Sequence, residues 1–565
     1  LPKPDLIVQT AEYKAPRSET EQLLADIWQE VLGVERIGIS DNFFTLGGDS
    51  IKGIQMASRL QQHGLKLEMK DLFQHPTVGG ISSYIESTEG KPVDQGPVEG
   101  EVMLTPIQRW FFERSFSNEH HWNQSVMLHA PSGFDPEIVE QTLQSLAGHH
   151  DALRMVYRKE GGRVIQYNRG PGEKAFAFRV VNLQYVSDAQ AEIAAQAERL
   201  QASLDIEKGP LMKAEQYQTA DGDHLLIVIH HLVVDGVSWR ILLEDFAAGY
   251  QQAAKNQDII LSDKTNSFKD WAEELAVYAQ SEQFLKTCGY WRELEKERVP
   301  ALPKDRIVSE RKTKDTAAAK FELTEEETRL LLTKVHEPYG TDINDILLSA
   351  LSLTIREWTN QSEVCINMEG HGREEIMPNM NISRTVGWFT AQYPVMLKDG
   401  EGDLPELIKT VKETLRQIPD KGVGYGILRY VTDRQKADID FSIKPEISFN
   451  YLGQIDHEVQ TEFFGPSPYD MGHQVSEESE ALYALSFSGI ISNEKLIMSC
   501  SFNTKEFDRR TVQERIERFK HHLISLIDHC TAKKEREFTP SDFSAGGLEM
   551  EEMGDLFDVL EENLK

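Results

Sequence analysis

Ser50 is the residue of this chain that is best placed for covalent chemistry. It follows Gly47, Gly48 and Asp49 and begins a predicted helix. The apolar face of that helix is formed by Ile51, Ile54, Ala57 and Leu60. The N–H groups at a helix N-terminus favour a phosphate, and the two glycines leave the hydroxyl open to a large partner. The residues therefore predict either a phosphate-linked attachment site or an ordinary serine cap.

A histidine pair is the strongest acid–base candidate in the larger part of the chain. His230 and His231 end an apolar, strand-like run and precede Asp235 and Gly236, which signal a turn. Imidazole has the side-chain pKa nearest neutrality, so a histidine at the mouth of a cleft suits proton transfer. The alternative is a pair of buried, hydrogen-bonded core histidines.

Neither the other histidines nor the cysteines indicate a metal site. A second doublet, His149 and His150, lacks the Asp-Gly turn, and two adjacent side chains rarely converge on one ion. No HExxH or CxxC pattern occurs, and the four cysteines lie far apart. We therefore expect His149 and His150 to be scaffold, no metal to be bound, and the setting to be a reduced cytoplasm.

Two predicted units position these residues. Helical patterns that begin near Ser18, Ser50, Asp71 and Thr77 predict a small all-α four-helix domain over 18–88. From residue 102 onward, amphipathic helices alternate with short β-rich runs, which predicts a large α/β domain. That region is too long for one compact core, so we expect two lobes around a channel, over 102–275 and 276–535.

Three further segments have the composition of connections rather than of cores. Residues 1–17 and 89–101 contain proline or glycine and lack periodicity, which is typical of linkers. Residues 536–565 are very acidic and amphipathic. Amphipathicity alone does not decide whether this tail is a frayed surface helix or a docking peptide for a partner.

Composition excludes several classes of partner. The chain has 565 residues, a formal net charge of −32 and 40% hydrophobic residues, which suits large folded cores. The acidic balance argues against nucleic acid and anionic membrane surfaces, and no apolar run approaches the ~20 residues of a membrane-spanning helix. The chain begins without Met or a signal-peptide pattern, so we expect it to be cut from a longer protein.

Several strings resemble those of nonribosomal peptide synthetases. Leu46-Gly-Gly-Asp-Ser50 resembles the phosphopantetheine attachment site of their carrier domains, in the form that is paired with epimerases. His230 to Gly236 resembles the HHxxxDG signature of the chloramphenicol-acetyltransferase-like superfamily, which includes condensation and epimerization domains. Five other segments resemble epimerization motifs and occur in family order: Thr105–Phe111, Glu369–Glu374, Arg384–Thr390, Gly422–Gly426 and Phe449–Gly453. The whole chain resembles the carrier–epimerization end of an initiation module, of the gramicidin S or tyrocidine synthetase kind.

The resemblance implies a role for each matching residue. Ser50 would carry 4′-phosphopantetheine, and His231 would point into the channel. Glu369 would be the second acid/base group. Supporting or channel positions would be taken by His230, Asp235, Gly236, Arg154, Asn450 and Tyr451. In the family the aspartate holds structure, commonly through an arginine, and Arg154 is a plausible partner for Asp235.

Inversion at Cα needs a proton removed from one face and a proton returned to the other. A thioester carbonyl delocalises the developing carbanion as an enolate, so no pyridoxal phosphate or metal is expected. His231 and Glu369 would act from opposite sides of the channel, and partial burial would raise the pKa of Glu369 toward neutrality. The alternatives are a Glu369 that is salt-bridged to Arg373 or Arg384, and Glu374 as the acting carboxylate.

The resemblance also implies partners and leaves other functions open. The partners would be an upstream adenylation domain of the same chain, a phosphopantetheinyl transferase, and a downstream condensation domain reached through the C-terminal tail. An amide-forming condensation domain and a non-catalytic carrier-binding domain are the alternative functions. Phenylalanine as the amino acid is implied only by the resemblance.

Overall fold

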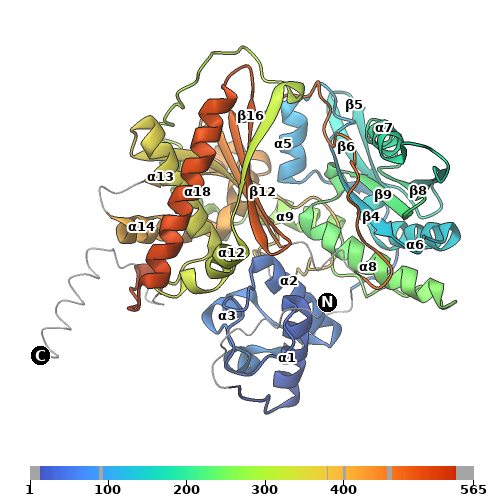
Figure 1. The fold of residues 1–565 in the computed structure, drawn as a ribbon, viewed down its shortest axis with the longest axis horizontal. Helices are drawn as coiled ribbons and strands as arrows, with labels where there is room; N and C mark the ends of the chain where they lie inside the picture. Colours follow the sequence, from blue (N-terminus) through green and yellow to red (C-terminus); the bar gives the residue numbers. More distant parts are fainter. Residues whose placement is uncertain (1–12, 88–92, 378–379, 399–402, 455–460, 543–565) are drawn as a thin grey trace, which may run out of the picture.

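The computed structural model shows a small helical unit beside a large α/β unit (Figure 1). It describes residues 13–87, 93–377, 380–398, 403–454 and 461–542. The four-helix prediction for the small unit is confirmed. Its elements are α1 (Glu19–Leu32), α2 (Ser50–Gln62), α3 (Met69–Gln74), α4 (Val78–Ile81), β1 (Leu65–Lys66) and β2 (Glu86–Ser87).

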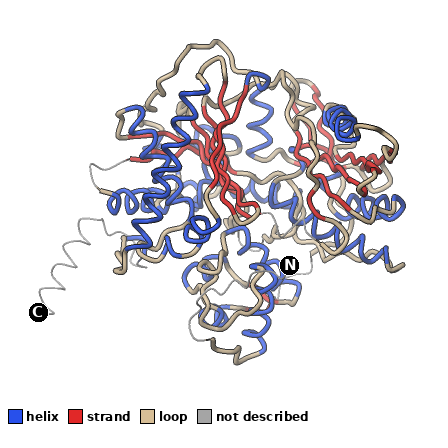
Figure 2. Tube along the Cα trace, in the orientation of Figure 1, coloured by secondary structure: helices blue, strands red, loops and turns tan. Residues whose placement is uncertain are grey.

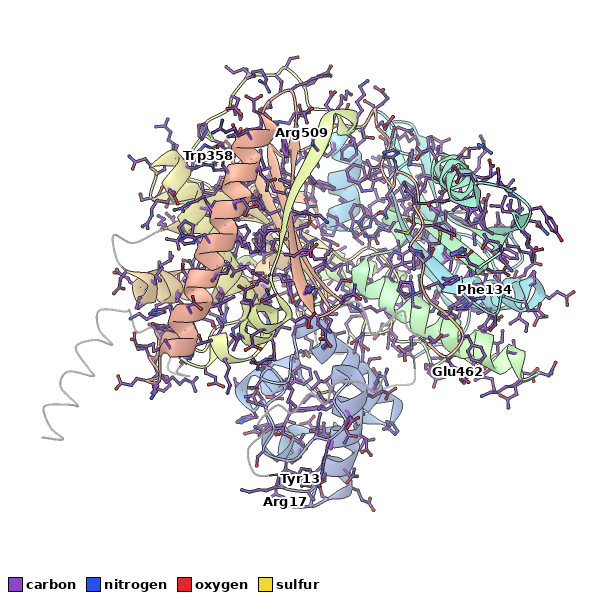
Figure 3. The ribbon with its side chains drawn as sticks, viewed as in Figure 1. Tyr13, Arg17, Phe134, Trp358, Glu462 and Arg509 are labelled. Atoms are coloured by element: carbon purple, nitrogen blue, oxygen red, sulfur yellow. The ribbon has the colours of Figure 1, made fainter. Side chains whose placement is uncertain are left out.

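Local signals explain the helices of the small unit. The side chains of Ser18 and Thr77 cap α1 and α4 by accepting from backbone N–H groups at 3.2 and 3.1 Å. The apolar stripes of the helices meet around Trp28 and Phe43, whose rings lie edge to face at 5.1 Å. Tyr13 and Arg17 lie at the end of this unit that is farthest from the large one (Figure 3).

The first lobe of the large unit contains a five-stranded sheet in the order β14-β4-β9-β8-β7 and a three-stranded sheet in the order β3-β6-β5. Its strands are β3 (Gly100–Val102), β4 (Asn123–Ala130), β5 (Met155–Glu160), β6 (Arg163–Asn168), β7 (Phe176–Asn182), β8 (Met212–Thr219), β9 (Gly222–His230) and β14 (Gly465–Pro466). Its helices are α5 (Pro106–Arg114), α6 (Pro136–His149), α7 (Ala189–Gln201) and α8 (Gly236–Ala254).

The apolar run before His230 is a strand that is buried on both faces. Leu226 and Val228 of β9 pack on the α7 side, whereas Leu225 and Ile227 belong to the main core with α6 and α8. A strand that is covered on both faces needs apolar residues at every position rather than alternating ones. The last residue of this strand, His230, therefore lies at the end of a strand that is paired on both sides, with β4 and with β8.

The second lobe is a six-stranded sheet in the order β10-β16-β15-β13-β11-β12, with helices against it (Figures 1 and 2). Its strands are β10 (Thr316–Glu322), β11 (Glu363–Gly370), β12 (Ala391–Lys398), β13 (Ile447–Gln454), β15 (Leu485–Ser492) and β16 (Lys495–Asn503). The helices from residue 268 onward are α9 (Phe268–Tyr278), α10 (Glu282–Leu285), α11 (Cys288–Leu294), α12 (Glu325–Leu332), α13 (Ile343–Thr359), α14 (Leu404–Arg416), α15 (Val423–Tyr430), α16 (Arg434–Ala437) and α18 (Arg509–Ala532).

The chain crosses between the lobes more than once. β14 pairs with β4 of the first lobe, and the Asn123 N–H donates to the Gln474 carbonyl at 2.7 Å. The predicted boundary at 275/276 falls inside α9. The acidic tail lies largely outside the described residues, which end at residue 542. None of the described helices has the length and apolar character needed to cross a membrane.

A buried ion pair between Asp235 and Arg373 joins the two lobes. Arg373 follows β11 and donates to Asp235 Oδ1 and Oδ2 at 3.1 and 3.3 Å. Asp235 also caps α8 through the Ser238 N–H at 2.7 Å and accepts from the Phe389 N–H at 3.0 Å. One carboxylate thus fixes the start of α8, the loop after β11 and the loop before β12.

The predicted partner of Asp235 is wrong. Arg154 instead binds the neighbouring Asp151 and the carbonyls of Ala147 and Gly148, at 2.8 and 2.9 Å for the two carbonyls. These acceptors lie within seven residues of Arg154, and its remaining donors bind the carbonyls of Arg169 and Val98 at 3.1 and 3.4 Å, so none of these bonds reaches Asp235. Asp235 does pair with an arginine, but from the opposite lobe.

We predict that Asp235→Ala destabilises the large unit by about 3–5 kcal/mol, because it leaves the Arg373 guanidinium buried without its counter-charge. Chemical denaturation followed by tryptophan fluorescence measures this loss. Asp258→Ala, which removes an exposed carboxylate after α8, is the matched control. Equal stabilities of the two variants would contradict the role of the ion pair.

Candidate active site

His231 is held in one tautomer at the end of β9. Its Nδ1 lies 2.7 Å from the Val234 carbonyl, and its backbone N–H donates to the Trp122 carbonyl at 2.9 Å. A carbonyl can only accept, so Nδ1 carries the proton and Nε2 keeps a lone pair. The ring packs on Trp388 with a centroid distance of 4.4 Å. Burial lowers the pKa of His231, so the neutral ring, a base at Nε2, is favoured.

His230 is a structural neighbour rather than a second base. Its side chain is fully buried, with Nε2 2.9 Å from the Glu119 carbonyl and Nδ1 accepting from the Leu232 N–H at 3.2 Å. Burial lowers its pKa to about 3. Both ring nitrogens are therefore occupied, and the ring stays neutral. The core-histidine alternative suits His230, whereas His231 is half-buried and its Nε2 faces a side-chain amide, that of Gln124, at 3.1 Å.

Glu369 lies in a polar row across three neighbouring strands. Its Oε2 accepts from Asn450 Nδ2 of β13 at 2.9 Å, and its Oε1 accepts from Gln392 Nε2 of β12 at 3.4 Å. Burial raises the pKa of Glu369 to about 7, and the Asn450 hydrogen bond partly offsets this rise. Neutral amides orient the carboxyl group without fixing it as an anion.

The two alternatives for Glu369 do not fit the geometry. Arg373 binds Asp235, and Arg384 binds Glu244 and Asp245, so neither arginine pairs with Glu369. Glu374 faces His371 at 3.4 Å. Glu369 is therefore the carboxyl group of this motif whose surroundings raise its pKa to near neutrality.

A series of contacts through two tryptophans leads from His231 to the surroundings of Glu369. Trp388 contacts His231 and lies edge to face with Trp110 at 6.3 Å. Trp110 lines a cavity together with Gln392, which is itself hydrogen-bonded to Glu369. The two tryptophans thus link the ring of His231 to a cavity that is also lined by Gln392, the hydrogen-bond partner of Glu369.

Two site residues were missed from the sequence, Gln124 and Gln392. The amide nitrogen of Gln124 lies 3.1 Å from His231 Nε2, and its Oε1 has no hydrogen-bond partner among the described residues. Each is a polar residue within an otherwise buried strand, at positions paired with Ile229 and Glu369. The sequence signal for these two residues was a polar side chain within a buried strand. That signal does not show that they lie beside His231 and Glu369, which only the strand register reveals.

Ser50 begins α2 where the small unit meets the large one (Figure 1). Asp49, rather than Ser50, caps the helix, accepting from the Ile51 and Lys52 N–H groups at 2.9 and 2.8 Å. Gly47 has φ +87°, and a Cβ there would meet nothing within 4 Å. A helix start beside this open space fits a phosphopantetheine attachment point.

The start of α2 faces the end of β13. A Cβ added at Gly453 would lie 3.1 Å from Asp49 Oδ2, and Lys52 Nζ lies 3.1 Å from Gln454 Oε1. Tyr451 points away from the Asn450 face of this strand, and its pKa is raised by burial and by the charge of Asp49. β13 therefore has the carrier contact at one end and the Glu369 contact at its middle.

Two groups of side chains in the described residues approach metal-ligand spacing. One is His149, His150 and Asp245; here Asp245 already binds His150 at 2.8 Å and Arg384 at 2.5 Å. The other is His129, Asp221 and His224. The rings of His129 and His224 stack at 4.5 Å with an interplanar angle of 10°, so their in-plane lone pairs do not converge on one ion.

Comparisons with known proteins show the family of each unit. The family model described as "Condensation domain" matches residues 98–548, and the one described as "Phosphopantetheine attachment site" matches residues 22–85. The crystal structure of the epimerization domain from the third module of tyrocidine synthetase B is 45% identical. That match has a TM-score of 0.76 and covers 79% of this chain and 100% of that one.

Two curated synthases match along the whole chain. Surfactin synthase subunit 2 of Bacillus subtilis (strain 168) is 63% identical, and gramicidin S synthase 1 of Brevibacillus brevis is 48% identical. The chain spans 16% and 52% of their respective lengths. The chain therefore belongs to the condensation-domain family of nonribosomal peptide synthetases, in which it pairs a phosphopantetheine carrier domain with an epimerization domain.

Proposed function

We propose that the chain carries an aminoacyl thioester on Ser50 and inverts its Cα from L to D with His231 and Glu369. The observation that carries this proposal is the buried Glu369 carboxyl, oriented by Asn450 and Gln392 with a pKa of about 7. A condensation enzyme would need only the shared histidine motif. A carboxyl group poised near neutrality across the channel from His231 supports reversible proton transfer.

The pantetheine thiol, when bound, supplies the thioester that acidifies the α-proton. His231 accepts or returns a proton at Nε2, because Nδ1 is committed to the Val234 carbonyl. Rotation of the Gln124 amide would turn its unpartnered Oε1 toward a protonated Nε2, which stabilises the imidazolium. Glu369 holds the second proton position, and its amide neighbours tolerate both the acid and the carboxylate.

In the reactive state, His231 and Glu369 together hold one transferable proton. If His231 is the base, then Glu369 must be the acid, and the reverse assignment carries the same total number of protons. The pKa of His231 is lowered and that of Glu369 is raised to about 7. Neutral His231 with protonated Glu369 is therefore the more populated arrangement just below pH 7.

The whole synthetase supplies the other steps. We propose an upstream adenylation domain that loads Ser50, a phosphopantetheinyl transferase that modifies it, and a downstream condensation domain reached through the tail 536–565. The resemblance in these regions and the partial coverage of the longer synthases support this arrangement. We place the enzyme in the cytoplasm, where these partners and reduced thiols would occur.

Replacing either acid/base group should abolish conversion while loading persists. We expect His231→Ala and Glu369→Gln each to slow L-to-D conversion by at least about 100-fold, because proton transfer at one face is lost. Chiral analysis of the released amino acid measures conversion, and intact-mass spectrometry measures loading. His521→Ala and Glu517→Ala, at exposed positions of α18, are the matched controls. Conversion unchanged in either site variant would remove that residue from the mechanism.

The rate of conversion should fall as pH rises above about 7, because the shared proton leaves Glu369. Since both directions use the same protonation state, L and D substrates should give the same apparent pKa. Single-turnover rates from pH 6 to 9, corrected for thioester hydrolysis, measure this. A rate that climbs steadily to pH 9 would contradict the shared-proton scheme.

Charge reversal at the start of α2 should slow conversion of the tethered substrate. Lys52→Glu removes the contacts of Nζ with Gln454 Oε1 at 3.1 Å and with the Gly47 carbonyl at 3.0 Å. We expect a rate several-fold lower with loading intact, measured by the same chiral assay. Lys14→Glu, at the far end of the carrier, is the control. Equal rates in the two variants would place docking on another face.

A further inference from the structure

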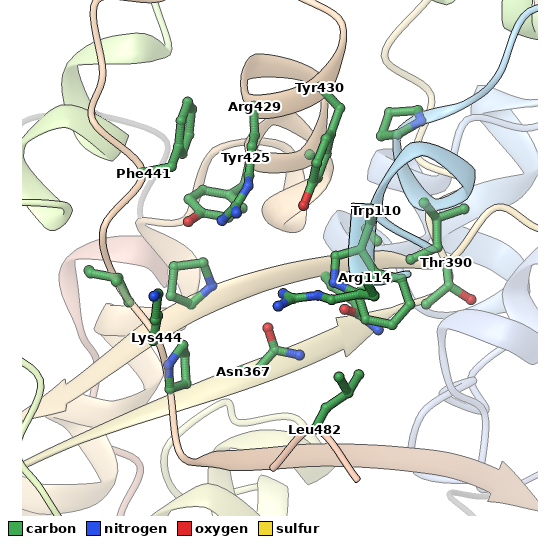
Figure 4. A pocket seen from close by; sticks show the side chains of 18 of the residues that line it. Trp110, Arg114, Asn367, Thr390, Tyr425, Arg429, Tyr430, Phe441, Lys444 and Leu482 are labelled. Carbon is green, nitrogen blue, oxygen red and sulfur yellow. The ribbon is translucent and has the colours of Figure 1, made fainter. Parts of the chain in front are cut away.

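The epimerization domain has a cavity of about 580 Å³ that is larger than an amino-acid side chain requires. It lies between α5, α15, β11 and β12, and it includes Asn367 and Gln392 (Figure 4). Asn367 and Glu369 alternate on the same face of β11, and they pair with Pro394 and Gln392 of β12. The cavity is therefore continuous with the face that carries Glu369.

β13 orders the carrier, Glu369 and the cavity along one line. Gly453 and Gln454 contact the carrier, Asn450 binds Glu369, and Glu446, just before the strand, lines the cavity. At about 3.3 Å per residue, Asn450 and its partner Glu369 lie roughly 10 Å from the carrier end, and Glu446 lies about 13 Å farther along the same line. Whatever is attached to the far side of the reacting residue is directed into the cavity.

Two cations that line the cavity have no counter-charge among the described residues. Lys304 and Arg311 are neutralised by Glu446 and Glu506, and Arg429 lies 3.5 Å from Glu113. Arg114 and Lys444, by contrast, are exposed to solvent where they line the cavity, and they form no ion pair with any residue that the structure describes. The guanidinium carbon of Arg114 lies 5.6 Å from the centroid of the Trp110 ring.

The two cations face the cavity from opposite sides. Arg114, at the end of α5, reaches toward Asn367, and Lys444 lies on the other side of Asn367 (Figure 4). Tyr483 also lines the cavity. Its pKa is raised by burial and by the charge of Glu369, and the charge of Arg114 lowers it. In a chain with a formal net charge of −32, a pair of free cations beside aromatic walls favours an anionic ligand.

We propose that this cavity is a subsite for an acyl or peptidyl chain on the amino nitrogen of the reacting residue, and that Arg114 and Lys444 select a chain that carries a carboxylate. This inference rests on the proposed function and narrows its substrate class. The free amine of a simple aminoacyl thioester would leave the cavity empty. A longer chain fills the cavity, packs on its rings and places its carboxylate between the cations.

The test uses the whole chain, loaded at Ser50 with N-succinyl- or N-succinamoyl-L-aminoacyl-pantetheine. The two acyl groups have the same shape and differ by one charge. We expect the succinyl substrate to be epimerized about tenfold faster, since one charge-assisted contact is worth about that much. The preference should shrink as salt is added, because the cavity is open to solvent.

The combined variant Arg114→Gln/Lys444→Gln should bring the two rates within twofold. We compare the ratio of the succinyl rate to the succinamoyl rate, because a general loss of activity lowers both rates and leaves their ratio unchanged. Lys174→Gln, which removes one exposed charge in the first lobe, should keep the wild-type ratio. Equal rates in the wild-type chain, or a preference that survives in the double variant, would overturn the proposal.

A binding measurement separates this proposal from the proposed function. Isothermal titration of the unloaded chain with the unreactive pantetheine thioethers of both acyl amino acids should show tighter binding of the succinyl compound, lost in the double variant. Absence of conversion with every loaded substrate, together with this binding preference, would contradict the epimerase assignment and leave the anionic subsite standing. Conversion of the loaded substrates without any binding preference would support the epimerase assignment and contradict the anionic subsite.

Discussion

The site depends on the buried contact between Asp235 and Arg373. The carboxylate caps α8 and binds the Phe389 N–H, while the guanidinium binds the carbonyls of Ile382 and Thr385, both at 2.8 Å. Trp388, the ring that packs on His231, precedes Phe389 directly. A buried ion pair adds little net stability when it is compared with well-packed apolar residues, but it tolerates few geometries. Its effect here is to hold His231 of one lobe at a fixed position relative to Glu369 of the other.

Burial shifts the pKa values of His231 and Glu369, the two proposed acid/base groups, in opposite directions. It disfavours the charged form of each, and so it lowers the pKa of His231 and raises that of Glu369. Because the imidazole is cationic and the carboxylate anionic, the same desolvation favours a neutral ring and a neutral acid. In the proposed mechanism the pair then holds one transferable proton near neutral pH, and the two nearby arginines, Arg373 and Arg384, are bound to other carboxylates. The amides of Gln124, Asn450 and Gln392 orient the groups and leave their charges free to change.

Much of this was accessible from the sequence, and the exceptions have a common cause. Local signals gave the caps at Ser18 and Thr77, the strand before His230 and the helix at Ser50. Ordered motifs gave the epimerization family. Arg154 was predicted as the partner of Asp235, but the partner is Arg373. An ion pair between residues that lie far apart in the sequence leaves no local sequence pattern from which it could be predicted. Gln124 and Gln392 were missed for the same reason. Their importance comes from strand register and not from spacing along the chain.

The central claim is that His231 and Glu369 serve opposite faces of one Cα, and exchange with heavy water tests it most directly. His231→Ala and Glu369→Gln would each be loaded with L- and, separately, D-aminoacyl-pantetheine and followed by mass spectrometry of the unconverted substrate. The account predicts that each variant still exchanges the α-proton of one enantiomer, and that the two variants exchange opposite ones. Exchange of both enantiomers by a single variant, or of the same enantiomer by both, would contradict an acid/base group on each face.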